Sequence, residues 1–260
     1  MTSDGVKSCC AALYETEWAR LLLGDSFHPG GLALTERLGS LLRLAPGMVV
    51  LDAACGRGNS ALYLAGTFSC QVIGVDFGAG NVAAGTEAAR ERSLDALTEF
   101  RIGDIESLPI EDATIDAVIC ECAFCTFPDK RRAAAEFARV LRPGGVVGLS
   151  DMTRSGEFPA ELKTLLAWIA CIADARPIEE YRSCLGKAGF TAGFIENHDE
   201  ALSQMVKDIR ARLLGLELLV KIGNTDLPFI DFEGAVAMAK VACEAVRTGQ
   251  LGYNLMTATR

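Results

Sequence analysis

Short apolar runs that alternate with helical stretches constrain the fold of this chain more than any other feature. Such runs are typical of strands buried on both faces of a sheet. Five are found, at MVVLDAA, QVIGVD, TEFRIGD, IDAVICE and VVGLSD. Helices are expected between them, for example over NVAAGTEAARERS and DKRRAAAEFARVL. Strands that alternate with helices predict an α/β fold with a doubly wound, mostly parallel sheet and right-handed crossovers.

The alternation is flanked by segments of a different kind. Two helices, SCCAALYETEWARLLLG and LALTERLGSLLRL, are expected before the first strand. After the sixth strand, TAGFIENH, come two helical stretches and then a last strand, LGYNLMTATR. We predict an N-terminal helical lid (residues 1–45), a sheet core (46–197), a helical insertion over one edge or mouth of the sheet (198–250) and the last strand of that sheet (251–260).

Charge and cysteine content limit the environment and the partners. The formal net charge is −9, and an acidic surface repels nucleic acid. No apolar run reaches the ~20 residues that cross a bilayer, and the N-terminus lacks the pattern of a signal peptide. We therefore expect a cytoplasmic protein without nucleic-acid or membrane partners, whose ten cysteines are mostly reduced. The oligomeric state is left open.

The turn after the first strand carries the first chemical signal. Gly56 and Gly58 allow a tight turn and a close approach to a ligand, while Asp52 and Asp76 end the first two strands. Ala61 is tolerated as the third position of a nicotinamide-binding G-x-G-x-x-G turn, so the glycines alone do not decide the cofactor. An acid at Asp52 would repel a pyrophosphate but suits a cationic ligand such as a sulfonium.

VLDAACGRG resembles the first motif of the class I S-adenosylmethionine (SAM) methyltransferases, with Ala54 in place of the first glycine. GDIESLPI, RVLRPGGVVGLSD and the AGF before the sixth strand resemble further motifs of that family, in order. The resemblance implies a Rossmann-like methyltransferase fold with a seven-stranded sheet, and SAM as cofactor bound by residues 46–197. The cofactor-binding residues expected are Asp52, Ala54, Cys55, Gly56, Gly58, Asp76 and Phe77 (ribose), Asp104 and Ile105 (adenine), and Glu121.

The stretch VICECAFCTFPDK holds three cysteines within six residues, Cys120, Cys122 and Cys125. In the family that it resembles, the substrate lies beyond the fourth strand, where this stretch is found. Cys120 and Cys122 share a face if the strand continues that far. Three interpretations are open: buried packing, substrate capture, or a zinc site, although C-x-C-x-x-C is not the usual paired spacing. We assign no metal ligand.

Substrate capture is favoured by a second resemblance, to the arsenite methyltransferase branch. VICEC and ACIADARPIEEY resemble its cysteine segments, and its cysteines before the first strand correspond to Cys9 and Cys10. Soft thiolates suit trivalent arsenic, whose lone pair would attack the sulfonium methyl. We predict Cys122, Cys171 and Cys10 as catalytic, and Cys9, Cys120 and Cys125 as substrate-binding. The chain departs from that branch in its length, in Cys125 and in residues 198–250.

Two alternatives stay open. A small organic substrate with a carbon, oxygen or sulfur nucleophile would need a base, for which His28 is the first candidate, with Tyr14 and Glu121 behind it. His28 and Tyr14 are therefore also predicted to contact the substrate. Alternatively, the protein senses a soft metal or the redox state through its thiols without turnover; intact acids at the strand ends favour an enzyme.

Overall fold

The computed structural model describes residues 5, 7, 21, 27–157, 172, 174–221 and 232–260. The predicted helix around Cys9, Cys10 and Tyr14 lies almost wholly outside these residues, as does the predicted helix that carries Cys171.

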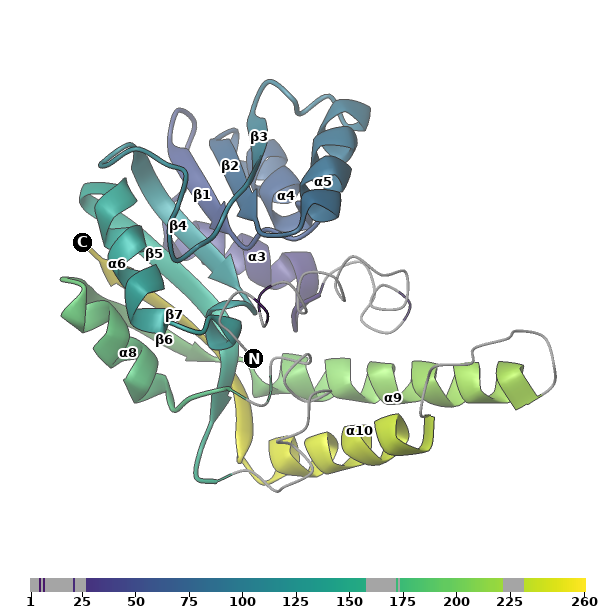
Figure 1. Ribbon diagram of the computed structural model, residues 1–260. Helices are drawn as coiled ribbons and strands as arrows, with labels where there is room; N and C mark the ends of the chain where they lie inside the picture. The colour runs from purple at the N-terminus through teal and green to yellow at the C-terminus, as the bar shows by residue number, and fades with distance from the viewer. Residues whose placement is uncertain are drawn as a thin grey trace.

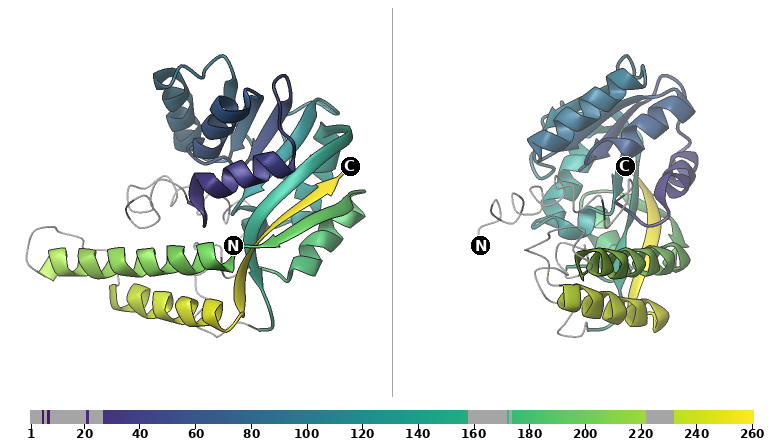
Figure 2. Two further views of the ribbon diagram at one scale, coloured as in Figure 1. Left: turned by 180° about the vertical axis from the view of Figure 1, so that it is seen from behind. Right: turned by 90° about the vertical axis from the view of Figure 1, so that its right-hand side faces the viewer.

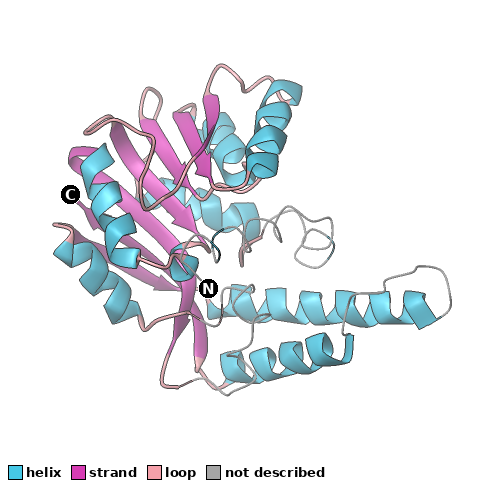
Figure 3. Ribbon diagram, viewed as in Figure 1, coloured by secondary structure: helices cyan, strands magenta, loops and turns pink. Residues whose placement is uncertain are grey.

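One seven-stranded sheet runs through the described part of the chain, in the order β3-β2-β1-β4-β5-β7-β6 (Figures 1 and 3). The pairs β1–β2, β1–β4, β2–β3 and β4–β5 are parallel, and β7 is antiparallel to β5 and β6. The predicted doubly wound, mostly parallel sheet is thus confirmed. The strands are β1 (Val49–Ala53), β2 (Gln71–Asp76), β3 (Thr98–Ile102), β4 (Ile115–Glu121), β5 (Leu141–Arg154), β6 (Thr191–Asn197) and β7 (Leu251–Thr259).

Helices cover both faces of the sheet (Figures 1 and 2). On one face lie α3 (Gly31–Leu41), α4 (Asn59–Phe68) and α5 (Ala79–Glu91), and on the other α6 (Lys130–Val140) and α8 (Ile178–Lys187). Crossovers between parallel strands are usually made by such helices. In α6 the buried side chains recur at helical spacing, at Ala133, Ala134, Phe137 and Val140. Its first turn is capped by Asp129, which accepts a hydrogen bond from the Arg132 amide at 3.0 Å.

Two long helices, α9 (Asp199–Lys221) and α10 (Phe232–Arg247), stand between β6 and β7 in the chain, where two helices are predicted. They lie side by side and extend beyond the sheet (Figures 1 and 2). A small apolar cluster of Leu213, Ala235 and Ala239 joins them. They leave the sheet at the carboxyl end of β6, the end at which the parallel strands β1, β2 and β4 also terminate. No described helix is long and apolar enough to span a membrane.

The segment after β4 is held by aromatic packing. Phe124, in the short 3₁₀ helix η1 (Phe124–Thr126), is fully buried. Its ring lies edge-on to Phe127 and Tyr181, with centroids 5.8 and 5.5 Å apart, and packs on Phe137 at 6.2 Å. Edge-to-face aromatic pairs stabilise a fold beyond the area that they bury. The loop that follows β4 is therefore fixed against α6 and α8.

Candidate active site

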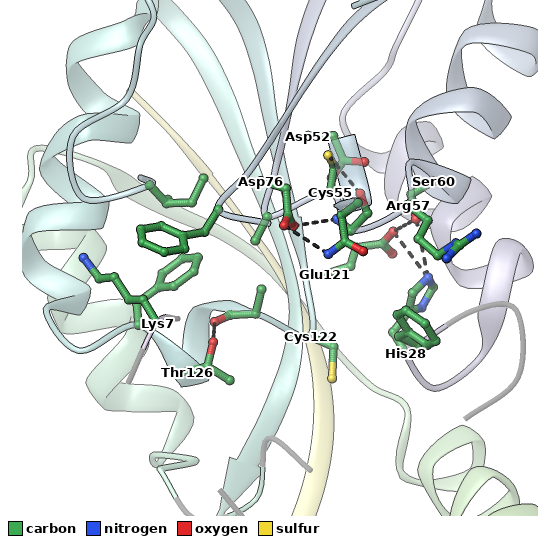
Figure 4. A pocket seen from close by; sticks show the side chains of 18 of the residues that line it. Lys7, His28, Asp52, Cys55, Arg57, Ser60, Asp76, Glu121, Cys122 and Thr126 are labelled. Atoms are coloured by element: carbon green, nitrogen blue, oxygen red, sulfur yellow. Dashed lines mark hydrogen bonds and ion pairs between the residues drawn. The ribbon is translucent and has the colours of Figure 1, made fainter. Parts of the chain in front are cut away.

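A pocket that is partly open to solvent lies at the carboxyl ends of β1, β2 and β4 (Figure 4). Nine of the ten residues predicted to bind the cofactor line it, all but Gly58. The position agrees with the rule that ligands of open α/β sheets bind at carboxyl strand ends. The lining residues are Lys7, Phe27, His28, Asp52, Ala54, Cys55, Gly56, Arg57, Asn59, Ser60, Asp76, Phe77, Asn81, Asp104, Ile105, Glu121, Cys122, Ala123, Thr126, Phe127 and Pro128.

The turn after β1 is built on left-handed backbone. Ala54, Gly56 and Gly58 have φ values of 60°, 52° and 79°. The Gly58 amide closes the turn on the Cys55 carbonyl at 2.9 Å. Gly58 is also required by packing, because a Cβ there would stand 2.4 Å from Cε1 of Phe100. The second glycine of the motif therefore makes room for a β3 side chain as well as allowing the turn.

Replacing Gly58 by alanine is expected to lower the free energy of unfolding by about 2–4 kcal/mol. The left-handed φ costs about 1 kcal/mol and the overlap with Phe100 costs about 1–3 kcal/mol. Urea denaturation measures the change, and Gly66→Ala is the matched control. Gly66 is in α4, and a Cβ there meets only Leu94, at 3.9 Å, so that variant is expected to be neutral or slightly stabilised. Equal stability of the two variants would contradict the assignment.

Asp76 holds the turn together from β2. Its Oδ2 accepts from the Gly56 amide at 2.8 Å, and its Oδ1 accepts from the Gly78 amide at 2.8 Å and Asn81 Nδ2 at 3.1 Å. Because Nδ2 donates to a carboxylate, the orientation of the Asn81 amide is fixed, and its Oδ1 is buried without a partner among the described residues. That oxygen and the remaining lone pair of Asp76 Oδ2 can accept two ligand hydroxyls, as many as a ribose offers.

Asp76→Ala is expected to weaken SAM binding at least tenfold and to lower the free energy of unfolding by about 2 kcal/mol, because two backbone amides lose their acceptor. From the sequence alone we expect this change to leave the fold intact. The hydrogen bonds of Asp76 in the structure indicate that it also lowers the stability. Calorimetric titration with SAM measures the affinity, and urea denaturation measures the free energy of unfolding. Asp95→Ala, at an exposed position, is the control. Unchanged affinity would refute a ribose role.

Asp52 is the most buried acid of the pocket. It is the penultimate residue of β1 and is 3% exposed, and its Oδ2 has no hydrogen-bond partner in the described residues. Burial, then the nearby charges of Glu121 and Asp76, raise the pKa of Asp52 well above its ordinary value. Three acids at adjoining strand ends leave a site that a cation would stabilise. The sulfonium and ammonium groups of SAM supply such charge, so the residues present fit this cofactor.

Glu121, at the end of β4, is surrounded by hydroxyl groups from three other elements. Its Oε2 accepts from Ser60 at 2.6 Å and from Thr35 at 2.9 Å, and its Oε1 accepts from Ser150 at 3.3 Å. His28 Nε2 lies 3.6 Å from the same Oε2. These hydroxyls are not among the predicted site residues, because no local motif marks them. The arrangement holds the carboxylate rigidly beside the predicted base.

The far end of the pocket contains the residues predicted for adenine. Asp104, Ile105 and a partly exposed Phe77 line it. Lys7 Nζ lies 2.8 Å from Asp104 and 2.6 Å from Glu106, which gives Asp104 a cationic partner. Burial is the largest single cause and lowers the pKa of Lys7. The hydrogen bonds and charges of Asp104 and Glu106 together outweigh it, so the pKa of Lys7 is raised. The sequence offers no signal for this pairing of residues far apart in the chain.

The cysteines are less concentrated at the pocket than the sequence suggests. Cys122 lines the pocket, whereas Cys120 and Cys125 are 0% exposed and lie in the core. Cys120 and Cys122 do not share a strand face, because β4 ends at Glu121 and Cys122 has a left-handed φ of 50°. The predicted convergence is thus not found for Cys120 and Cys125. Burial, then Asp151, raises the pKa of Cys120 well above its ordinary value, so it stays a neutral thiol.

The other residues predicted to contact the substrate, together with Cys55, are divided between the pocket wall and the part of the chain outside the described residues. His28 and Cys55 line the pocket. Burial, then Asp52, raises the pKa of Cys55 well above the usual range of a thiol, so it is not a thiolate. Cys9, Cys10, Tyr14 and Cys171 lie outside the described residues, and their roles stay predictions. Within the described part of the chain no group of three cysteine, histidine or acidic side chains could hold a metal ion.

The strand order and the pocket of acids at three strand ends suit an α/β protein with a cationic nucleoside cofactor. A sequence family described as a methyltransferase domain matches residues 51–149. The arsenite methyltransferase of Halobacterium salinarum is 32% identical over 77% of this chain and 53% of its own length. Phosphoethanolamine N-methyltransferase 1 of Arabidopsis thaliana is 29% identical over 72% of this chain and 38% of its own length. The chain therefore spans about half the length, or less, of these relatives.

Solved structures share the fold. The geranyl diphosphate C-methyltransferase of Streptomyces coelicolor, in complex with geranyl diphosphate and S-adenosyl-L-homocysteine, matches with a TM-score of 0.78 and 19% identity, covering 98% of this chain and 97% of that one. Phosphoethanolamine N-methyltransferase 2 of Haemonchus contortus, with S-adenosyl-L-methionine, matches at 0.76 and 20% identity, over 100% and 57%. Residues 51–149 of this chain thus match a methyltransferase domain, the chain has the fold of the SAM-dependent methyltransferases, and its pocket fits SAM.

Proposed function

We propose that this protein transfers the methyl group of SAM to a thiol-bound trivalent metalloid such as arsenite, with Cys122 as one of the thiolate ligands. The observation that carries the proposal is the place of Cys122. Its left-handed backbone turns it out of β4 onto the wall of the pocket, next to Glu121 and across from the acids of β1 and β2. The 32% identity to an arsenite methyltransferase supports the same acceptor.

The residues of the chain would act mainly by binding and orientation. Capture of arsenite exchanges an As–O bond for an As–S bond at Cys122, and the thiol proton leaves with the hydroxide as water. Cys9, Cys10 and Cys171 are the candidates for further thiol ligands. When bound, SAM supplies a methyl group on a positively charged sulfur, and it departs as a neutral thioether. The acids Asp52, Asp76 and Glu121 stabilise the cationic reactant, and a metalloid lone pair needs no base.

The proposal is tested with the purified chain, SAM, arsenite and glutathione, by chromatography with arsenic-specific mass detection. Methylated arsenic that appears with time and with enzyme concentration is the expected result. Its absence at every thiol concentration would remove the metalloid acceptor. Binding of arsenite without consumption of SAM would instead indicate a soft-metal sensor. Thiolate chemistry needs reduced cysteines, which agrees with the cytoplasmic location that we propose.

A second candidate is methyl transfer to a small organic molecule. The observation in its favour is the contact of His28 with Glu121, at 3.6 Å, within the pocket. A carboxylate beside an imidazole fixes the orientation of the ring, as a general base requires. Relatives named for phosphoethanolamine and fold neighbours named for geranyl diphosphate act on such molecules. His28→Gln separates the two candidates: it would abolish transfer to an organic acceptor and leave metalloid methylation within about threefold.

A further inference from the structure

A buried lysine holds two acids at the adenine end of the pocket, and the proposed methyl transfer assigns it no role. Lys7 Nζ donates to Asp104 Oδ1 at 3.0 Å and Oδ2 at 2.8 Å, and to Glu106 Oε2 at 2.6 Å. Its side chain is 12% exposed and lies at the end of the pocket away from His28 (Figure 4). An ammonium has three protons, and these two carboxylates accept all of them. Lys7 therefore acts on a ligand through the two carboxylates.

Backbone hydrogen bonds fix the two acids that the lysine joins. Glu106 is almost fully buried, and its Oε1 accepts from the amide of Asp129, the N-cap of α6, at 2.7 Å. The Glu106 amide donates to Asp104 Oδ1 at 2.9 Å. The loop after β3 is also tied to β2, because the Gly103 amide donates to the Asp76 carbonyl at 2.9 Å. The lysine thus completes a cluster whose other members are already held in place.

The hydrogen bonds of Asp104 leave it one acceptor site. An ionised carboxylate has about four lone-pair sites. Oδ1 accepts from Lys7 and from the Glu106 amide, and Oδ2 accepts from Lys7 alone among the described residues. The Asp104 side chain is 31% exposed and lines the pocket, so the remaining site on Oδ2 is open to a ligand. Asp104 thus presents an acceptor, which suits an amino group and repels a carbonyl oxygen.

We propose that Lys7 is a positioning residue that makes the pocket select a base with an amino group, because it holds the Asp104 carboxylate with its one open acceptor site toward that group. The inference rests on SAM as cofactor and on the predicted adenine role of Asp104, and not on the metalloid acceptor. A carboxylate held in one orientation cannot turn to accept from the ring N–H of a 6-oxo base. A site that leaves a polar group unpaired with the wrong ligand discriminates strongly. Without Lys7 the carboxylate can rotate, and the selection weakens.

Calorimetric titration of the whole chain with two ligands, without any acceptor, tests the proposal. S-adenosylhomocysteine has a 6-amino group, whereas S-inosylhomocysteine has a 6-oxo group and a ring N–H. Lys7→Met is expected to weaken S-adenosylhomocysteine about tenfold and to leave the affinity for S-inosylhomocysteine within about twofold, so the preference between them falls at least about fivefold. Lys7→Arg is expected to recover part of the preference, since it restores the charge.

Lys130→Met is the matched control for the loss of a buried ion pair. The Lys130 side chain is 11% exposed, close to the value for Lys7, and its Nζ lies 2.5 Å from Asp174 Oδ2. Lys130 is not among the residues that line the pocket. This variant is expected to keep both affinities within about twofold of those of the unchanged protein.

Asp104→Asn separates a failure of this proposal from a failure of the adenine assignment. An amide both donates and accepts, so this variant is expected to lose most of the preference. A preference that survives in Asp104→Asn would remove the adenine role of Asp104, and the proposal with it. A preference lost in Asp104→Asn but kept in Lys7→Met would leave that role and reject Lys7 as its support.

Equal losses for both ligands in Lys7→Met would mean that Lys7 serves the fold alone. Circular dichroism and thermal unfolding identify a variant that fails to fold. If Lys7→Met is such a variant, Lys7→Arg takes its place: a preference between those of the unchanged protein and Asp104→Asn is expected, and an unchanged preference would overturn the proposal. Because no acceptor is present in the titrations, failure of the metalloid proposal leaves them readable.

Discussion

Replacing Cys122 by serine is expected to lower the rate of arsenite methylation by at least about 100-fold, equivalent to about 2.7 kcal/mol of activation free energy. Serine keeps the shape of the side chain but replaces a soft sulfur by a hard hydroxyl that stays protonated at neutral pH. Trivalent arsenic strongly prefers thiolate over hydroxyl ligands. Cys122 is half-buried, lines the pocket and packs on the edge of the core, and the substitution changes a single atom at the pocket wall.

The affinity for SAM separates this effect from damage to the fold. Cys122→Ser is expected to bind SAM within about twofold of the unchanged protein, since no cofactor contact is assigned to Sγ. Cys184→Ser is the matched control, because Cys184 is also half-buried but lies in α8, away from the pocket. Full activity of Cys122→Ser would make Cys122 a packing residue and remove the metalloid proposal. A parallel loss of SAM binding would show that Cys122 supports the cofactor site.

Cys120 and Cys122 show how much of the structure could be predicted from the sequence. Apolar runs and turn glycines define the strands well, because burial on both faces and the tight turn are local requirements. The alternation of side chains along a strand is also a local rule, and it predicts that residues two apart share a face. It cannot predict that β4 ends between these two cysteines, where a left-handed φ at Cys122 breaks the alternation. That end depends on how Phe124 packs against α6 and α8, which is a tertiary effect.

Glu121 illustrates a second limit. The acids at the strand ends can be found from the sequence, because each stands at the end of an apolar run. The hydroxyls that surround Glu121 come from α3, α4 and β5, and only the crossover connections bring them together. The same holds for Lys7, which is about 100 residues from its partners Asp104 and Glu106. β5 is also longer than the run VVGLSD, since its antiparallel pairing with β7 continues to Arg154.

Asp52→Asn is expected to weaken SAM binding about 10- to 100-fold and, without ligand, to stabilise the fold. The loss of affinity follows from removing a buried charge that would face a cation. The gain in stability follows from the environment of Asp52, where burial and the charges of Glu121 and Asp76 raise its pKa well above the ordinary value. A gain of about 1 kcal/mol would raise the Tm by about 2–4 °C in a domain of this size.

The sign of the pH dependence follows from that raised pKa. The folded chain binds the Asp52 proton more tightly than the unfolded chain, so the protonated acid favours the folded state. This contribution is fully present below the ordinary pKa of an aspartate, about 3.9, and is lost as the pH rises through the raised value. Asp52→Asn should therefore be more stable than the unchanged protein chiefly above that window. SAM affinity of the unchanged protein should fall as the pH drops through the same window, and that of the variant should not.

Thermal unfolding with and without saturating SAM provides the decisive comparison. A ligand that binds only the folded state raises stability in proportion to the logarithm of its concentration over Kd. The unchanged protein should gain more from SAM than Asp52→Asn, so the order of the two Tm values should reverse when the cofactor is added. A variant that is less stable without ligand and gains equally from SAM would mean that Asp52 serves as a structural acceptor. Asp52 would then be part of the scaffold, and the charge of the cofactor would have to be balanced by Asp76 and Glu121 alone.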